Sequence, residues 1–191
     1  GAVPRRRCLW DSGTKDARHS LVLCDLNWVR LGPQRLALAQ FFDPPATHHH
    51  LDELTTREMA HAPGYRSTAL LLVGWLAAQL AWENGHGKGN SLGFEKICEE
   101  KKQAIEITLR EKAGEPIGNV TVRSTTAEFK VDHREGADLL DVAFGRTNGR
   151  KMQQLFPAGK SDPASLVQEE LMRGGPHRVY LHAVEKVRAF L

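Results

Sequence analysis

Cysteine is scarce in this sequence, with Cys8, Cys24 and Cys98 the only three among 191 residues. The number is odd and no two of them have the CxxC spacing, so the sequence indicates neither a disulfide framework nor a zinc site. Reduced thiols are usual in the cytosol. We therefore expect a cytoplasmic protein that holds no metal and no other cofactor.

A long apolar run and a strong charge of one sign are also lacking. The longest apolar stretch, residues 70–82, is shorter than the about 20 residues that cross a bilayer, and no signal peptide is visible. The 26 basic and 23 acidic residues leave a formal charge of only +3, whereas a nucleic-acid-binding protein needs a concentrated basic face. The sequence therefore predicts neither a membrane nor a nucleic acid as a partner.

Catalytic motifs are absent as well, since GxSxG does not occur and the Ser, His and Asp residues are scattered. His48, His49 and His50 are adjacent, so their side chains point in different directions and make a poor metal site. The glycine-rich stretch 84–93 lacks the GxxxxGKS/T spacing of a phosphate-binding loop and follows a predicted helix rather than a strand. We interpret both stretches as surface loops.

Residues 70–82 (LLLVGWLAAQLAW) are apolar on nearly every face, interrupted only by one glycine and one glutamine. A helix without a polar side belongs in a core, so this stretch predicts a central buried helix. Ser67 or Thr68 would cap its first turn, and Gly85 would end it. Gly74 costs about 1 kcal/mol relative to alanine inside a helix. We expect it to allow the close approach of another backbone, for example that of a sheet.

Further helices are predicted over residues 33–42, 164–172 and 178–190, where apolar residues recur at helical spacing. The first has proline in its first turn and stops before the pair Pro44-Pro45. Residues 51–59 could form a short helix or an edge strand, and local propensity favours the helix. In the second helix the residues at helical spacing are Leu166, Val167, Glu170 and Leu171.

Apolar and polar residues alternate over 104–110, 117–123 and 127–132, and less strictly over 139–144. This period, with short turns between the segments, is typical of an antiparallel meander with one dry face. The buried helix would cover that face. The predicted fold class is therefore α+β, an antiparallel-rich sheet packed against a central buried helix, with two C-terminal helices, in a single domain that spans residues 1–191.

Three segments of the chain match motifs of a known family. Residues 25–45, which begin DLNWVRL, resemble its DLxWTRLTPWRxLxAQxFD, and residues 67–82, STALLLVGWLAAQLAW, resemble its ALLLAGWLASRLGW. Residues 166–180, LVQEELMRGGPHRVY, are similar to its closing LLAEELRRLGxDxVYxxAL. The matches keep their order, with strand-rich sequence between the second and the third. The chain thus resembles OpcA, the family of glucose-6-phosphate dehydrogenase assembly proteins.

The chain departs from this family in several places. Its members are longer, with an α/β region before the first motif, so we expect this chain to lack that region or to begin after it. The family's TPW triplet is Gly32-Pro33-Gln34 here, which removes one aromatic side chain. The approach to Asp25 is short and divergent. The C-terminal segment has no cysteine, so thiol regulation is not carried over.

The resemblance implies a non-enzymatic partner of glucose-6-phosphate dehydrogenase, in the oxidative pentose phosphate pathway, that acts as an assembly factor or allosteric activator. Candidate contact residues are Trp28, Arg30 and Arg35, because tryptophan and arginine dominate interface hot spots. The alternative for these residues is that Trp28 lies in the core and Arg30 is merely solvated.

Two other functions are open at this point. The chain could be a sugar-phosphate-binding protein or enzyme that uses loop 84–93 and Arg66, and binding of a phosphosugar by the isolated chain would favour this. It could also be a structural module with a different partner, which a pull-down lacking the dehydrogenase would favour. The missing catalytic motifs weaken the enzyme hypothesis, and the ordered motif matches favour the dehydrogenase partner.

Overall fold

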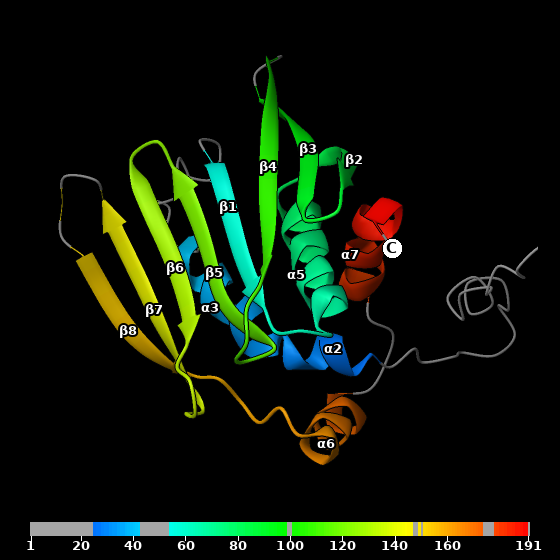
Figure 1. The fold of residues 1–191 in the computed structure, drawn as a ribbon, viewed down its shortest axis with the longest axis vertical. Coiled ribbons are helices and arrows are strands. Elements are labelled where there is room, and N and C mark those ends of the chain that lie inside the picture. The colour runs from blue at the N-terminus through cyan, green and yellow to red at the C-terminus, as the bar shows by residue number, and fades with distance from the viewer. Residues whose placement is uncertain are drawn as a thin grey trace, which may run out of the picture.

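Eight strands and five α-helices make up the described part of the chain (Figure 1). The computed structural model describes residues 25–42, 54–98, 101–146, 149, 151–173 and 178–190. The short apolar run 21–24, Cys8 and the three adjacent histidines lie outside these ranges. Within them, no helix combines the length and the apolar character needed to cross a membrane.

The elements follow one another as two helices, a strand, a helix, seven strands and two helices. The helices are α2 (Leu26–Arg30), α3 (Gly32–Phe42), α5 (Arg66–Gln79), α6 (Pro163–Arg173) and α7 (Arg178–Val187), followed by the 3-10 helix η2 (Arg188–Phe190). The strands are β1 (Leu54–His61), β2 (Glu83–Lys88), β3 (Ser91–Cys98), β4 (Lys101–Glu111), β5 (Ile117–Ser124), β6 (Ala127–His133), β7 (Leu139–Arg146) and β8 (Lys151–Pro157). The three predicted helices beside α5 are confirmed as α3, α6 and α7 with η2, and the four predicted strands as β4 to β7.

All eight strands belong to one mixed sheet, in the order β2-β3-β4-β1-β5-β6-β7-β8. Strand β1 pairs parallel with β4 and antiparallel with β5, and every other neighbouring pair is antiparallel. Parallel neighbours need a long crossover, and here it runs through α5 and the β2–β3 hairpin. The predicted α+β class, an antiparallel-rich sheet packed against one central helix, is therefore wrong: the sheet is mixed at its centre, because β1 lies between β4 and β5.

Strand β1 places polar side chains in the core, so its sequence lacks the alternation of apolar and polar residues that indicates a strand. Arg57 and His61 are 3% and 2% exposed and share a sheet face with buried Met59. The Arg57 guanidinium lies 4.6 Å from the centroid of the Trp82 ring, and burial lowers the pKa of Arg57 to about 9. The helix favoured for this segment is wrong; the alternative strand is confirmed, but β1 is an inner strand and not an edge strand.

The glycine-rich stretch predicted as a loop is a hairpin at one edge of the sheet. Strand β2 pairs antiparallel with β3, and the turn between them holds Gly89 at φ +63°, which glycine adopts at little cost. Strand β8, at the opposite edge, has no counterpart among the predicted strands. Its sequence KMQQLFP shows no clean alternation of apolar and polar residues.

Helices cover one face of the sheet, and none of the described helices covers the other, which we call the open face (Figure 1). Helix α3 packs against β6, β7 and β8, whereas α5 packs against β1 and most extensively against α7. The cover is thus shared by two helices, which is the second correction to the predicted fold. Helix α5 is buried at every position from Thr68 to Ala77, so it has no solvent-facing side.

Gly74 brings the backbones of α5 and α7 into contact. An added Cβ at Gly74 would lie 2.1 Å from the carbonyl oxygen of Ala183 and 3.1 Å from the side chain of Val187. Both α7 residues are fully buried. The predicted close approach of a second backbone is confirmed, but that backbone belongs to a helix and not to the sheet.

Both ends of α5 differ from the prediction: the helix stops at Gln79, and Gly85, predicted to end it, lies in β2. Tyr65 occupies the cap position and makes no side-chain cap hydrogen bond, so neither Ser67 nor Thr68 is the cap. The Thr68 hydroxyl instead donates to Asn27 Oδ1 at 3.0 Å. This bond ties the first turn of α5 to α2, which positions the helices described next.

Gly74→Ala is expected to destabilise the protein, although alanine is the better helix former by about 1 kcal/mol. The added methyl group would collide with the Ala183 carbonyl, so we expect a loss of about 1–3 kcal/mol in the free energy of unfolding, measured by urea denaturation. The control is Gly118→Ala, where the nearest atom to an added Cβ is 4.0 Å away. Equal stability of the two variants would contradict the close packing of α5 on α7.

Candidate functional site

Helix α2, the first turn of α3 and helix α6 form what we call the helical end, at the bottom of Figure 1. Helix α2 leads through Leu31 directly into α3, because the Arg35 N–H donates to the Leu31 carbonyl at 2.9 Å. Asp25 caps α2: its Oδ1 accepts from the Asn27 N–H at 2.8 Å, and its Oδ2 accepts from the Tyr180 hydroxyl of α7 at 3.2 Å. One carboxylate thus anchors the helical end to the C-terminal helix.

Trp28 and Arg35 form a stack at the centre of the helical end. Trp28 is 3% exposed and meets the Tyr180 ring edge to face, with 5.4 Å between centroids. The Arg35 guanidinium lies over the Trp28 ring, 3.6 Å from its centroid. Its Nη2 donates to the Trp28 carbonyl at 3.2 Å and its Nε to the Leu31 carbonyl at 3.4 Å. The stack holds a cation in one orientation at a partly exposed position.

The charge on Arg35 is influenced by α6. Burial lowers the pKa of Arg35 to about 10, with the nearby Arg173 lowering it further and Glu169 opposing the change. Arg35 therefore stays protonated at neutral pH. Glu169 also accepts from Arg173 Nη2 at 2.6 Å, one helical turn along α6. Two arginines and one glutamate thus leave this part of the surface with positive charge.

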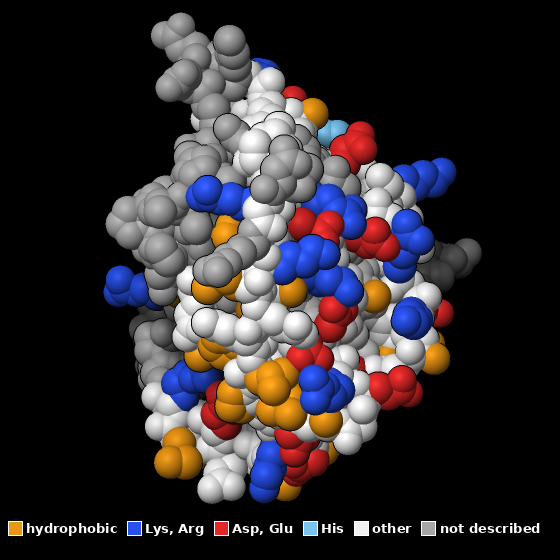
Figure 2. Space-filling model, turned by 90° about the vertical axis from the view of Figure 1, so that its left-hand side faces the viewer, with side chains coloured by type: hydrophobic (Ala, Val, Ile, Leu, Met, Phe, Trp, Pro, Cys, Tyr) orange, Lys and Arg blue, Asp and Glu red, His pale blue; other side chains and the backbone are white. Residues whose placement is uncertain are grey.

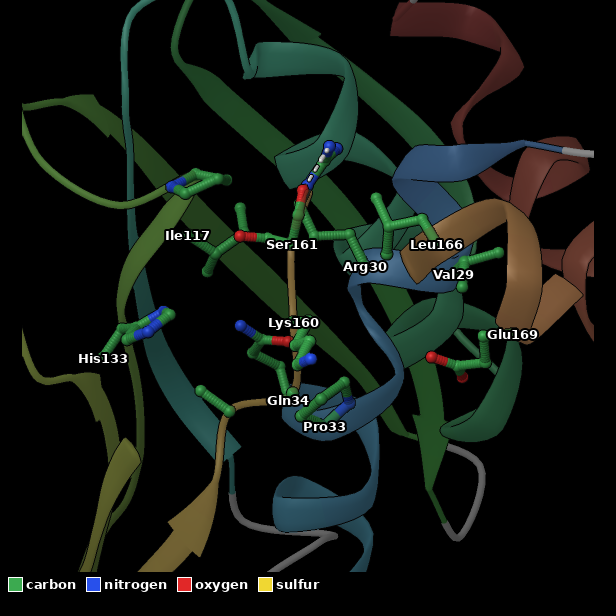
Figure 3. Close-up of a pocket in the computed structure, with 13 residues that line it drawn as sticks. Val29, Arg30, Pro33, Gln34, Ile117, His133, Lys160, Ser161, Leu166 and Glu169 are labelled. Atoms are coloured by element: carbon green, nitrogen blue, oxygen red, sulfur yellow. Dashed lines mark hydrogen bonds between the residues drawn. The ribbon is translucent and has the colours of Figure 1, made fainter. Parts of the chain in front are cut away.

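Arg30 lies beside this stack and is held by three contacts. Its Nη1 donates to Asn27 Oδ1 at 2.8 Å, its Nη2 donates to the Ser161 carbonyl at 3.5 Å, and its guanidinium carbon is 5.3 Å from the centroid of the Tyr65 ring. Figure 3 shows the bond to Ser161 at the rim of a recess between α2, α3, the turn before β5 and α6. Arg30 thus links α2 to the segment that leads into α6.

The recess is polar but small. Gln34 and Lys160 lie between His133 on one side and Glu169 on the other (Figure 3). Among the described residues, Gln34 Oε1 and Arg30 Nε are buried without a hydrogen-bond partner. The enclosed space is about 20 Å³, enough for one water molecule, whereas metabolite pockets measure about 300–1,000 Å³. The recess therefore does not suit a metabolite.

Helix α6 presents apolar side chains to solvent. Val167, Leu171 and Met172 are 42%, 76% and 80% exposed, whereas Leu166 and Glu170 face inward and are buried. The predicted apolar stripe of this helix is thus split, because Leu166 packs inward while Val167 and Leu171 point away. Exposed apolar residues one turn apart on a helix are typical of surfaces that dock into a partner's groove.

The sequence-predicted site residues lie together in α2 and α3, but they differ in exposure. Arg30 and Arg35 are half-buried, and Trp28 lies in the core beneath Arg35. Their role as contact residues stays a prediction. The sequence did not predict the exposed side of α6. Its only signal is that Val167 and Leu171 are apolar although they lie beside the stripe with which the helix packs on the core.

The hairpin 84–93, the alternative site for a sugar phosphate, has the wrong charge. A hollow beside it is lined by Glu83, Glu185 and Lys186, with Lys186 paired to Glu83 at 2.7 Å. The Arg66 guanidinium is occupied by the carbonyls of Gly89, at 2.9 Å, and Phe190, at 3.5 Å. Two carboxylates against one cation disfavour a phosphate group there.

Three histidines in the described ranges contact backbone rather than a nucleophile. His61 Nδ1, His86 Nδ1 and His133 Nε2 each lie within 3.2 Å of a backbone carbonyl. In the part of the chain that the structure describes, no three His, Cys, Asp or Glu side chains gather as a metal site.

Comparison with known proteins gives a consistent set of relatives. A family model that describes the C-terminal domain of a glucose-6-phosphate dehydrogenase subunit matches residues 22–184. The OxPP cycle protein OpcA of Synechocystis sp. is 35% identical over 188 residues, with 88% of this chain and 39% of that protein covered. The protein of the same description from Synechococcus elongatus is 24% identical over 174 residues, with 83% and 39% covered. The chain thus spans about two fifths of the length of these relatives.

Solved structures show only a distant likeness. The aldose-aldose oxidoreductase from Caulobacter crescentus is 10% identical, with a TM-score of 0.45 over 85% of this chain and 57% of that one. A likeness at this level says nothing about the chemistry of this chain.

Arg35→Ala is expected to lower the free energy of unfolding by about 1–2 kcal/mol, because a largely desolvated contact between a cation and an indole ring is lost. The measurement is chemical denaturation followed by tryptophan fluorescence. The control is Arg173→Ala, which removes an exposed pair with Glu169 worth at most about 0.5 kcal/mol. A loss no larger for Arg35 than for Arg173 would contradict the stack.

Proposed function

The chain belongs to the family defined by the C-terminal domain of the glucose-6-phosphate dehydrogenase subunit, to which the OpcA proteins are related, and we propose that it binds glucose-6-phosphate dehydrogenase in the cytoplasm and promotes its assembly or its active conformation. The chain acts as a non-enzymatic partner in the oxidative pentose phosphate pathway. The observation that carries the proposal is the family match, which extends over residues 22–184.

The helical end supplies a surface of the expected kind. Arg30 and Arg35 are held at fixed positions by Asn27, Trp28 and nearby carbonyls, so little side-chain entropy is lost when a partner binds them. The exposed Leu171 and Met172 lie on the adjoining helix α6. Arginine and methionine are enriched at interfaces, and an apolar patch beside ordered cations suits a partner groove with an acidic rim.

Activation needs only a difference in affinity between two states of the dehydrogenase. If the chain binds the active or assembled state more tightly, it shifts the population toward that state by no more than this difference. A tenfold preference corresponds to about 1.4 kcal/mol. One or two apolar contacts on α6 and one charged contact from Arg30 or Arg35 supply that amount if they form in only one state.

Neither of the two cavities beside the sequence-predicted sites suits a sugar phosphate. The recess at the helical end holds only one water molecule, and the hollow beside the hairpin carries more negative than positive charge. The sugar-phosphate enzyme hypothesis for residues 84–93 therefore finds no support in the hairpin.

Leu171→Lys is expected to weaken binding to the dehydrogenase by about tenfold or more, because burial of a leucine side chain contributes about 1.5–3 kcal/mol. Leu171 is 76% exposed, so the variant should fold normally. The matched control is Leu155→Lys on strand β8, where the leucine is 55% exposed. Affinities are measured by biolayer interferometry with the cognate dehydrogenase.

Two results would count against this surface. Unchanged affinity of the folded Leu171 variant would remove α6 from the interface, and no binding by the unchanged chain would sink the proposed partner itself. A pull-down that recovers a different protein and no dehydrogenase would favour a structural module with another partner.

Arg30→Glu is expected to abolish the activation of the dehydrogenase, because charge reversal replaces attraction to an acidic rim by repulsion. The readout is the dehydrogenase rate at a subsaturating concentration of glucose 6-phosphate. The control Lys88→Glu makes the same change of charge on the distant β2–β3 hairpin. Activation retained by a variant whose circular dichroism spectrum is unchanged would show that Arg30 makes no essential contact with the dehydrogenase.

A further inference from the structure

The open face of the sheet contains a hollow over Ala143 and Gly145 of β7, where the side chains are small or absent. Figure 2 looks on to the β8 side of the molecule, where Lys and Arg side chains lie among Asp and Glu side chains over the upper half. Here β7 presents Ala143 and Gly145 on the open face, between Lys130 of β6 and Lys151 of β8. The volume of this hollow is about 560 Å³, within the range of about 300–1,000 Å³ found for small-molecule sites.

The register of the strands explains this shape. Arg123, Glu128, Gly145 and Lys151 face one another across β5, β6, β7 and β8, so they form one row on the same face. Glycine leaves a gap in that row, and Lys151 leans into it: an added Cβ at Gly145 would lie 3.3 Å from Lys151 Cγ. The next row places Ala143 beside Lys130. The hollow thus has a small floor and long cationic walls.

Positive charge is concentrated in this hollow. Its charged lining is one acidic side chain and four basic ones, an excess of three that equals the excess of the whole chain. Glu128 is already paired with Arg123, and Lys130 is paired with Asp132 at 2.6 Å. Within the described residues, Arg146 and Lys151 have no ion pair. Lys151 is therefore available to an added anion, and Arg146, which follows Gly145 and so lies on the other face of β7, lines the end of the hollow.

From this geometry we propose that the hollow over Ala143 and Gly145 binds a small phosphorylated metabolite. The phosphate group contacts Lys151, which forms charge-assisted hydrogen bonds with its oxygens, and Arg146 adds positive charge at the end of the hollow. The remainder of the ligand lies over Ala143 toward Lys130, which is two strands or about 10 Å from Lys151. An extended acidic protein segment is the competing occupant, but the volume of the hollow is the one typical of a small-molecule site.

This site is separate from the helical end and does not depend on binding to the dehydrogenase. It lies where β5 and β7 end and β6 and β8 begin, whereas β8 leads from there down to α6 (Figure 1). A metabolite would therefore bind to the chain at the end of the sheet opposite to the proposed partner surface.

The test is isothermal titration calorimetry of this chain alone at low ionic strength. The probes are glucose 6-phosphate, which the name of the family's dehydrogenase specifies, inorganic phosphate and glucose. We expect glucose 6-phosphate to bind more tightly than phosphate, and glucose not to bind. Equal affinity for phosphate and glucose 6-phosphate would reduce the site to a bare anion site and overturn the metabolite proposal, as would binding of glucose.

Lys151→Glu is expected to weaken binding of glucose 6-phosphate by about tenfold or more, because one charge-assisted hydrogen bond is replaced by repulsion. Lys112→Glu, an equally exposed cation just beyond β4, is the control and should bind normally. A heteronuclear NMR titration of the unchanged chain provides a readout without mutation, with the largest shifts expected at the amides of Ala143 and Gly145. Equal weakening in both variants, or shifts elsewhere only, would overturn the proposal.

The same variants distinguish the competing occupant. If glucose 6-phosphate and phosphate both fail to bind, while Lys151→Glu weakens binding to the dehydrogenase, the hollow receives an acidic protein segment and the metabolite proposal is wrong. Failure of the dehydrogenase to bind leaves the calorimetric result unaffected, so the two proposals fail independently.

Discussion

The fold depends on a helix that has no side for solvent. Helix α5 is buried from Thr68 to Ala77, so the chain must surround it with the sheet and with a second helix. Gly74 allows α7 to approach until backbones touch, and α7 in turn supplies Tyr180, which holds both Trp28 and Asp25 of the helical end. A chain of direct contacts therefore leads from the core helix to the surface residues proposed to meet the dehydrogenase. Loosening α5 against α7 would disturb those residues without changing any of them.

The sequence predicts this core well and the sheet poorly, for physical reasons that lie in single residues. The run 70–82 has one interpretation because no helix face in it could meet water. Strand β1 defeats the same reasoning, because Arg57 is accommodated in the core by the face of the Trp82 ring, a contact that no local pattern reveals. With β1 misassigned, β4 and β5 are expected to be neighbours, and the parallel pair at the centre of the sheet cannot be anticipated. The β2–β3 hairpin was likewise hidden, since its glycines resemble a loop.

One candidate site could be found from the sequence, and two could be found only from the structure. The segment 25–45 resembles the family's first motif and contains Trp28, Arg30 and Arg35, but only the structure shows that Trp28 supports Arg35 from below. The exposed side of α6 and the hollow over Gly145 depend on tertiary arrangement: the first on which stripe of α6 packs inward, the second on the register of four strands. Periodicity shows that a helix or strand has two sides, and packing decides which side meets a partner.

The central claim is that this chain changes the behaviour of glucose-6-phosphate dehydrogenase by binding one of its states more tightly. The most direct measurement is the rate of the cognate dehydrogenase as a function of glucose 6-phosphate concentration, with and without a saturating amount of the chain. The account predicts that the chain lowers the concentration needed for half-maximal rate or raises the plateau. Superimposable curves at every concentration, together with separate elution of the two proteins in gel filtration, would contradict it.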